Sequence, residues 1–593
     1  MIEKLLVDSL QKAVQNLYGQ ELNSKLAQIQ KTRPEIQGDY TIVVFPLLRI
    51  SKKGPEPTAN EIGEFIVDDL PEVAEYNIIK GFLNLTVADS YWNEFFTKKS
   101  NDNIFGSHED KHNDPIVVEY SSPNTNKPLH LGHIRNNLLG WSVSQILKNN
   151  GQSVKKVNLV NDRGIHICKS MLAWQKWGNN ITPESSNTKG DKLVGDYYVL
   201  FDKKYKIEIA SMVEQGIDKD EAAKTAPLMI EVKNMLKDWE DGKEDVKELW
   251  QTMNQWVYNG FDVTYDKMGI DFDKIYYESD TYLLGKKLVE EGLKNGVLFK
   301  KEDNSVWCDL TDDGMDHKLL MRGDGTSVYM TQDLGTAELR YDDYHPAKLV
   351  YVVGNEQNYH FDVLKIVLKK LDKSWADNIH HLSYGMVELP HGKMKSREGT
   401  VVDADDLMQE MYETAKATTE ELGKIDDFSE QEASDLYRTV SLGALKYFIL
   451  KVDPKKQMMF NPEESIDFNG NTGPFIQYTY ARIQSILRKV DTAKIGELSS
   501  NNMKLEAKEK ALLKHLANYP QLVKQAAANY SPSQVANYIF DLVKEFNKFY
   551  QEHSILKEED EQKKLFRIHM SQQVADVVES GMGILGITVP TRM

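Results

Sequence analysis

The chain has 593 residues, and its 72 Lys and Arg against 90 Asp and Glu give a formal net charge of −18. At roughly 100–200 residues per domain, this length predicts three to five domains with sizeable buried cores. A hydrophobic fraction of 41% and a charged fraction of 27% exclude a disordered or collagen-like chain, and the sequence contains no apolar run near the roughly 18 residues that span a bilayer.

Residues 1–112 predict a small α+β domain. Met1–Val14 has the pattern of an amphipathic helix and contains two acidic residues, which argue against a signal peptide. Strand candidates follow at Tyr40–Leu47 and Asn77–Val87. Thr97–Asn113 is polar and has a linker composition, so we place a domain boundary there.

Residues 113–460 predict a split Rossmann-like α/β domain built from two strand–helix–strand halves. The first half has strands at Pro115–Tyr120 and Val154–Val160 around a helix at Leu131–Asn149, and the second has strands at Ala347–Val353 and near His381–Val387 around a helix at Phe361–Leu371. Such units form parallel sheets. The charged segment Asn179–Asp271 is expected to be a mostly helical insertion in this domain.

After about Asp403 strand signals nearly vanish, and residues 461–593 predict an all-α helix bundle. Its apolar residues recur at helical spacing at Val535, Ile539, Leu542, Val543 and Phe546. The two cysteines, Cys168 and Cys308, form no CxxC pair, which excludes a disulfide framework and a four-cysteine zinc site. We expect both to be buried and structural.

The sharpest local signal is the motif His130-Leu131-Gly132-His133, where the loop after the first strand enters the helix. Histidines three apart share a helix face, and a helix N-terminus favours a phosphate. Gly132 leaves room for a nucleotide near the backbone. This composition gives an HxGH motif by chance about 0.02 times. Two capping histidines without a ligand are the structural alternative, and zinc is disfavoured because no third ligand cluster is apparent.

A second signal, Lys393-Met394-Lys395-Ser396-Arg397, follows the last strand of the second half. Basic residues on a glycine-flanked loop at the carboxyl edge of a sheet suit a polyphosphate. A short basic loop that is simply solvated is the alternative.

Together these signals resemble the HIGH and KMSKS motifs of class I aminoacyl-tRNA synthetases. Within that class, the flanking residues are similar to the arginyl-tRNA synthetase family. The similar segments are Glu119–His133, Gly38-Asp39-Tyr40, Gly81–Asn84 and Gly470–Tyr478. The resemblance extends from Gly38 to the end of the sequence. It implies ligation of L-arginine to its tRNA through an arginyl-adenylate, with ATP as substrate, Mg²⁺ bound with ATP, and AMP and pyrophosphate released.

The resemblance also implies which residues bind ATP. They are His130, Gly132, His133, Lys393, Met394, Lys395, Ser396 and Arg397. The histidines would contact the phosphates during the attack on the α-phosphorus, and Lys393 would neutralise the departing pyrophosphate. The full second motif has a lysine where this chain has Ser396. We predict that Lys127, three residues before His130, supplies the missing charge as a catalytic residue, and that Lys395 contributes less.

Arginine always carries a charge and five donors, so its pocket needs carboxylates and planar acceptors. The resemblance assigns this role to Glu119, Asn124, Tyr329, Asp333 and Gln357. Asn124 and Gln357 match positions that hold the α-amino and carboxylate groups. For each residue taken singly, a structural role is the alternative, such as a helix cap or a paired strand-end carboxylate.

RNA contact must overcome the acidic total charge. No acidic residue lies between Asp467 and Asp491, and this stretch contains Arg482, Arg488 and Lys489 beside Phe475, Tyr478 and Tyr480. Such a stretch suits phosphate contact and base stacking, and we predict tRNA contacts at Tyr478, Arg482, Arg488 and Lys489. In the family, the helical domain binds the anticodon and the N-terminal domain contacts the tRNA elbow.

Two other functions remain open from the sequence. A small-molecule nucleotidyltransferase also uses HxGH, but such proteins are usually shorter and lack a long helical C-terminus. A synthetase-like RNA-binding regulator would have a decayed active site, which the intact His130, His133, Lys393 and Asp333 disfavour. We expect a cytoplasmic protein that does not bind membranes, holds no structural metal, and is a monomer, as is typical of the family.

Overall fold

The structure is a computed structural model that describes residues 2–33, 35–99, 105–107, 112–388, 402–421, 423, 427–490 and 503–593. The chain divides into two compact units. The first unit comprises Met1–Phe105, Ser485–Asn518 and Leu542–Asp576, and the second comprises Gly106–Gln484, Tyr519–Asp541 and Val577–Met593.

The first unit contains an antiparallel sheet of order β1-β2-β4-β3, which is the α+β fold expected for the N-terminal residues. Its elements are α1 (Ile2–Tyr18), β1 (Ile29–Lys31), β2 (Tyr40–Val43), α2 (Leu48–Ser51), α3 (Pro55–Asp69), β3 (Val73–Ile79), β4 (Phe82–Val87) and α4 (Asp89–Lys99). Lys510 pairs with Asp89 at 2.5 Å, and Lys514 pairs with Asp39. These ion pairs join the sheet domain to a distant segment within the same unit.

Both strand predictions in this unit need correction. The strand predicted at Tyr40–Leu47 ends at Val43, and a 3₁₀ turn containing Pro46 follows, because proline lacks the N–H that a ladder requires. The strand predicted at Asn77–Val87 is two antiparallel strands. Lys80 and Gly81, with φ of 51° and 78°, form the turn between them.

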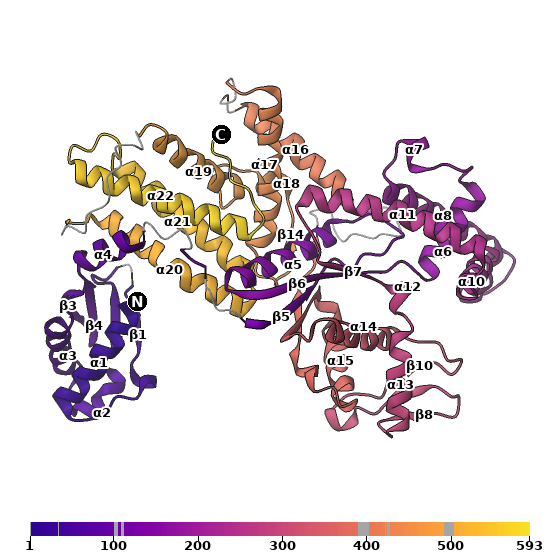
Figure 1. Ribbon diagram of the computed structural model, residues 1–593, viewed down its shortest axis with the longest axis horizontal. Helices are drawn as coiled ribbons and strands as arrows, with labels where there is room; N and C mark the ends of the chain where they lie inside the picture. Colours follow the sequence, from indigo (N-terminus) through magenta and orange to yellow (C-terminus); the bar gives the residue numbers. More distant parts are fainter. Residues whose placement is uncertain are drawn as a thin grey trace. The chain divides into compact units, whose positions relative to one another are not determined.

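The second unit is built on a five-stranded sheet of order β12-β11-β5-β6-β7 (Figure 1). All four strand pairs are parallel. The strands are β5 (His112–Glu119), β6 (Gln152–Val160), β7 (Lys274–Tyr277), β11 (Lys348–Gly354) and β12 (Ile379–Tyr384), and the two predicted helices are α5 (Leu131–Asn149) and α15 (Asn358–Lys370). The expected split Rossmann-like sheet is therefore confirmed. The strand expected near His381–Val387 ends at Tyr384.

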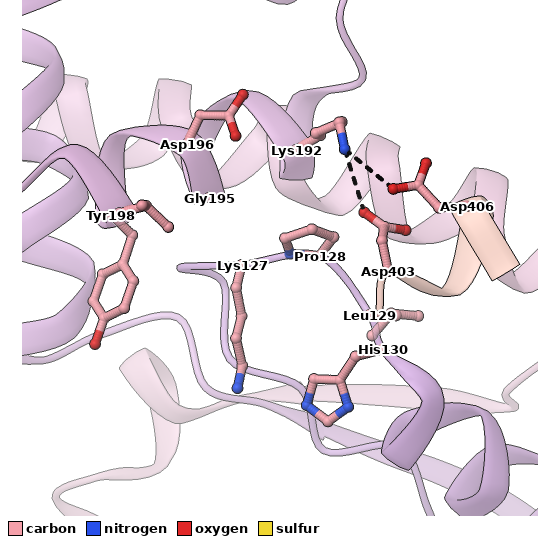
Figure 2. Close-up of a pocket in the computed structure, with 11 residues that line it drawn as sticks. Lys127, Pro128, Leu129, His130, Lys192, Gly195, Asp196, Tyr198, Asp403 and Asp406 are labelled. Carbon is pink, nitrogen blue, oxygen red and sulfur yellow. Dashed lines mark hydrogen bonds and ion pairs between the residues drawn. The ribbon is translucent and has the colours of Figure 1, made fainter. Parts of the chain in front are cut away.

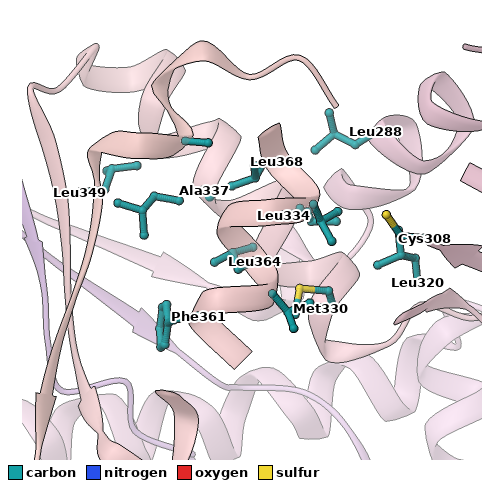
Figure 3. Packing of buried hydrophobic residues seen from close by; sticks show 14 of the residues in the cluster. Leu288, Cys308, Leu320, Met330, Leu334, Ala337, Leu349, Phe361, Leu364 and Leu368 are labelled. Atoms are coloured by element: carbon teal, nitrogen blue, oxygen red, sulfur yellow. The ribbon is translucent and has the colours of Figure 1, made fainter. Parts of the chain in front are cut away.

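Between its two halves the sheet domain carries elements that the sequence did not predict. They are α6 (Ile165–Trp177), α12 (Glu278–Thr281), α13 (Leu284–Lys294) and an antiparallel sheet of β8 (Leu298–Lys300), β9 (Val306–Cys308) and β10 (Lys318–Met321). Helix α14 (Tyr329–Tyr344) also lies in this part of the chain. One hydrophobic cluster packs α13, α14 and α15 against both sheets. Met330, Leu334 and Ala337 contribute to it from one face of α14 (Figure 3), so this helix is fixed by its buried side.

The insertion Asn179–Asp271 is mostly helical, as predicted. Its helices are α7 (Pro183–Ser186), α8 (Gly190–Glu214), α9 (Lys219–Thr225), α10 (Pro227–Glu240) and α11 (Glu244–Met268). A Cβ added at Gly190 would lie 2.1 Å from the carbonyl oxygen of Trp256. Helices α8 and α11 therefore approach each other closely.

The later part of the chain is helical where it is described, apart from the short β13 (Val387–Glu388) paired with β14 (Met458–Met459). The helices are α16 (Ala404–Glu421), α17 (Glu430–Leu450), α18 (Pro462–Ser465), α19 (Gly473–Leu487), α20 (Ala507–Asn529), α21 (Pro532–Glu552) and α22 (Glu561–Ile584). The predicted apolar positions on α21 are fully buried, as are both cysteines. Of the helices described, none has the length and apolarity that crossing a membrane demands.

Candidate active site

The HxGH motif and the predicted arginine-binding residues lie at the carboxyl edge of the parallel sheet. The chain moves outward from β5 to β6 and β7, and then returns to place β11 on the other side of β5. The crevice between β5 and β11 is thus the point where strand order reverses, which is where open α/β sheets bind ligands. The loop after β5 carries the HxGH motif, and the turn after β11 carries Gln357.

His130 and His133 cap helix α5. His130 Nδ1 accepts a hydrogen bond from the Gly132 N–H at 3.1 Å, and His133 Nδ1 accepts one from the His130 N–H at 3.2 Å. The ring centroids are 3.9 Å apart. Because each Nδ1 is an acceptor, each neutral ring carries its proton on Nε2. Both rings therefore present an N–H donor at the end of the helix that favours phosphate.

Burial keeps these rings neutral. Desolvation, reinforced by the charge of Lys127, lowers the pKa of His130 to about 3. Desolvation, His130 and Lys127 lower the pKa of His133 far below its ordinary value. Burial also lowers the pKa of Lys127. The motif is therefore a compact, desolvated group in which two neutral histidine rings lie close to Lys127.

Lys127 and His130 line a cavity of about 240 Å³. Helix α8 of the insertion forms part of its wall with Lys192, Gly195, Asp196, Tyr198 and Val199. Figure 2 shows the Lys127 side chain extending alongside the His130 ring. No pattern in the sequence indicated that the charged insertion borders the HxGH loop.

Val402–Asp406 contributes the remaining cavity wall with Asp403 and Asp406. Its backbone pairs with the HxGH loop: the Ala404 N–H donates to the Leu129 carbonyl at 2.9 Å, and the Leu131 N–H donates to the Val402 carbonyl at 3.3 Å. The predicted basic loop precedes this segment. Its site residues Lys393, Met394, Lys395, Ser396 and Arg397 lie outside the described residues.

The predicted arginine-binding residues occupy three elements at the same edge. Asn124 is exposed on the loop after β5, and Gln357 is exposed after β11. Tyr329 and Asp333 share the first turns of α14, where Tyr329 is 74% exposed. The Asp333 carboxylate contacts His360 Nε2 at 2.5 Å. Each of these residues has polar atoms that a substrate can reach.

Glu119 differs from the other four. It is buried, and its Oε2 pairs with Nη2 of Arg340 at 2.5 Å. Ser122 donates a hydrogen bond to its Oε1 at 3.2 Å, and Arg340 also donates to the Tyr351 hydroxyl at 3.2 Å. Burial raises the pKa of Glu119, although Arg340 opposes that shift. Arg340 lies 221 positions away, and nothing in the sequence pattern linked it to this strand end.

Glu278 is a site residue that the sequence analysis missed. It begins α12 directly after β7, so it lies at the same carboxyl edge as Asp333. Burial raises the pKa of Glu278 to about 7, and the charges of Asp162 and Asp333 add to that shift. The charge of Arg163 and a hydrogen bond donated by Gln332 oppose it. A carboxyl group beside Asp333 suits a guanidinium. Its position after a strand was the available signal, but β7 itself was not predicted.

The four predicted tRNA-binding residues have different surroundings. On α19, the Arg482 guanidinium lies over the Tyr478 ring at 5.0 Å, and both residues are partly buried. Arg488 and Lys489 follow this helix and are exposed. No group of His, Cys, Asp and Glu among the described residues is arranged to hold a metal ion.

Comparison with known families agrees with this geometry. Residues 98–461 match the family described as tRNA synthetases class I (R), catalytic domain, and residues 476–593 match the DALR anticodon binding domain. The chain belongs to the arginyl-tRNA synthetase family. The resemblance inferred from HxGH and its flanks is confirmed.

Individual relatives support this assignment. The chain is 60% identical over 595 residues to the arginine–tRNA ligase of Bacteroides fragilis, and equally to that of Bacteroides thetaiotaomicron, covering 100% of both partners in each case. Among solved structures, Thermus thermophilus arginyl-tRNA synthetase matches with a TM-score of 0.78 at 23% identity, covering 100% of each chain. The Plasmodium falciparum arginyl-tRNA synthetase matches with a TM-score of 0.75 at 19% identity, covering 100% of this chain and 99% of the other. These two structures show a shared fold.

Proposed function

We propose that the chain ligates L-arginine to its tRNA at the β5–β11 edge, through an arginyl-adenylate formed from ATP. Family membership makes it an arginine–tRNA ligase that uses ATP. The observation that carries the assignment of the site is the pair of neutral histidines capping α5 beside Lys127.

Adenylate formation is the attack of the arginine carboxylate on the α-phosphorus, with pyrophosphate leaving. Negative charge spreads over the phosphate oxygens in the transition state, and fixed donors stabilise it. His130 and His133 donate from Nε2, while Lys127 contributes a full charge from the same loop. Because the backbone holds both rings before ATP arrives, little reorganisation accompanies the reaction.

At the other end of the site, carboxylates select the substrate side chain. Asp333 and Glu278 accept donors from the guanidinium, and Tyr329 closes that part of the pocket. Asn124 and Gln357 hold the α-amino and carboxylate groups, from the loops after β5 and β11. Glu119 acts through Arg340, which it keeps in place beneath this surface.

The second basic motif completes the phosphate site. Lys393 neutralises pyrophosphate, and Met394, Lys395, Ser396 and Arg397 bind the nucleotide. Mg²⁺ accompanies ATP, since this ion is commonly held by one or two carboxylates together with substrate phosphates. When bound, the ion neutralises phosphate charge.

For tRNA, we propose that residues 461–593 bind the anticodon and residues 1–112 contact the elbow, flanking the catalytic residues 113–460. Arg482 and Tyr478 offer a stacked cationic pair, and Arg488 and Lys489 offer exposed charges for phosphates. Arg488→Ala should raise the KM for tRNA and leave the KM for ATP unchanged. We propose a cytoplasmic monomer, as the family resemblance implies.

Pyrophosphate exchange into ATP, measured with each of the twenty amino acids with and without tRNA, tests the function. Exchange should depend on arginine, and the family resemblance implies that it also depends on tRNA. Exchange that is independent of amino acid would point to a nucleotidyltransferase instead. No exchange under any condition would point to a regulator that binds RNA without catalysis.

A further inference from the structure

The charged insertion is joined to the segment after the basic motif by an ionic cluster. Asp405, the second residue of α16, receives three donors from the insertion: Lys189 Nζ at 2.5 Å, Lys267 Nζ at 2.7 Å and the Thr264 hydroxyl at 2.9 Å. Its side chain is only 18% exposed. We call Lys189, Thr264, Lys267 and Asp405 the α16 clamp.

Further contacts within the insertion hold the Lys189 side of the clamp in place. Lys189 also pairs with Asp191 at 3.0 Å, and Asp191 is fully buried. The Lys192 N–H donates to Asp191 at 2.9 Å. A Cβ added at Gly260 would lie 2.5 Å from Asp191 Oδ1. Helices α8 and α11 thus pack tightly around the base of the clamp.

On its other side, the clamp lies next to the catalytic loop. Asp405 adjoins Ala404, whose N–H donates to the Leu129 carbonyl at 2.9 Å. Asp403 forms an antiparallel bridge with His130. The backbone that carries the clamped carboxylate is therefore the same backbone that pairs with the residue capping α5.

The electrostatics of the cluster favour a charged, fixed carboxylate. Burial raises the pKa of Asp405, but hydrogen bonds from Lys189 and Lys267 outweigh burial and lower the pKa overall. Partly buried ion networks are poor sources of net stability, and hydrophobic residues of similar size often replace them without loss. What such a network does provide is a defined register between the parts that it joins.

We propose that Asp405 is a positioning residue for adenylate formation, and that through the α16 clamp the insertion sets the place of the His130 cap relative to the phosphates. The proposal rests on the function proposed above. It gives the insertion a role in catalysis without contact between its helices and the reacting atoms. A shift of about 1 Å in a positioned group can cost about 100-fold in rate. A small displacement of Asp405, passed through the backbone that pairs with the HxGH loop, is therefore enough to slow the reaction.

The test is Asp405→Ala, with Asp343→Ala as its matched control. Asp343 likewise receives two strong donors, Lys274 Nζ and the Tyr276 hydroxyl at 2.6 Å each, and its side chain is 27% exposed. Single-turnover adenylate formation with tRNA present should fall by about 10- to 100-fold in Asp405→Ala and by less than about twofold in the control. The KM for arginine should stay within twofold of wild type in both.

Three further measurements separate positioning from a general loss of folding. Both variants should show similar thermal midpoints, and Asp405→Glu should recover most of the rate. Lys267→Met keeps the aliphatic stem of a 53% exposed side chain and should slow adenylate formation by about threefold. Rates in Asp405→Ala and Lys267→Met that match the control would overturn the proposal. A wild-type protein without arginine-dependent exchange would instead overturn the proposed function.

Discussion

The two ends of the proposed site are built differently. At the phosphate end, His130 and His133 are held by backbone N–H groups and are desolvated. At the arginine end, Tyr329 is 74% exposed, and Asp333 is held by a side chain, His360. The histidine cap is held in place before any substrate arrives, whereas the arginine end remains open to solvent.

This difference follows from what each end must recognise. The phosphate end stabilises charge that develops during the reaction, so its donors must already be fixed. The arginine end binds a cation that is present from the start, and the partly exposed Asp333 carboxylate can receive it without the loss of a fully buried ion pair. Substitutions at the buried, pre-paired groups should therefore have larger effects than substitutions at the open end.

The largest effect is expected at Glu119, whose pair with Arg340 lies beneath the arginine end. Glu119→Gln leaves a buried guanidinium without its counter-charge, which costs about 3–5 kcal/mol of folding free energy. The midpoint of unfolding in urea measures this loss. Glu119→Leu combined with Arg340→Met should recover much of it. A stable Glu119→Gln protein with a raised KM for arginine would instead make Glu119 a direct ligand of arginine.

At the phosphate end, Lys127→Ala should slow adenylate formation by about 10²- to 10³-fold, the scale of losing one preorganised donor. Pre-steady-state measurement of the adenylate gives the rate. Lys192→Ala is the matched control, because Lys192 lines the same cavity but pairs with Asp406 at 3.5 Å. Lys395→Ala should cost clearly less than Lys127→Ala. If it costs more, Lys127 is not the compensating charge.

At the open end, Asp333→Asn should weaken arginine use and leave ATP binding unchanged. Losing one partner of a charged pair costs about 2–5 kcal/mol, and with 39% of the side chain exposed we expect the lower end, roughly 30-fold in kcat/KM. Glu338→Gln, on the same helix and paired with Lys373, is the control and should leave arginine use intact. An unchanged kcat/KM in Asp333→Asn would remove Asp333 from the pocket.

How far the sequence predicts each end depends on how local its contacts are. The histidine cap of the phosphate end is contained in one loop and helix, and its hydrogen bonds span at most three residues. Residue spacing alone therefore indicated the cap and the limits of α5. The Glu119–Arg340 pair joins residues 221 positions apart, and the contacts of the α16 clamp span 138 to 216 positions. Such pairs leave no periodic signal.

The fold, like the site, was predicted only where an element has a local and regular residue pattern. Long strands and helices with regular apolar spacing were identified, while strands β8 and β9 have only three residues each and show too few alternations to recognise. Strand ends were misplaced where Pro46 and Gly81 interrupt an apolar run. The five-stranded sheet was predicted as two halves, but its edge strand β7 was missed, and Glu278 with it.

The smallest effect is expected at Glu278, where the pH dependence of the KM for arginine gives the most specific test of the open end. Burial raises the pKa of Glu278 from 4.5 to about 7, so its carboxyl group is mostly neutral below that pH and charged above it. A charged carboxylate binds the guanidinium more tightly. The KM for arginine should therefore rise as the pH falls from 8 to 6, by at most about tenfold, because the charged fraction of a group with a pKa near 7 changes about tenfold between those two pH values.

Glu278→Gln is the control for that pH profile, because it removes this one titration and leaves those of ATP and tRNA in place. The variant should show a raised KM for arginine that no longer rises as the pH falls from 8 to 6. Its thermal midpoint should stay near that of wild type, since the amide can still accept the hydrogen bond from Gln332. If the variant keeps the wild-type pH profile, the proton that controls arginine binding lies elsewhere. In that case the open end would select its substrate through Asp333 without help from the end of β7.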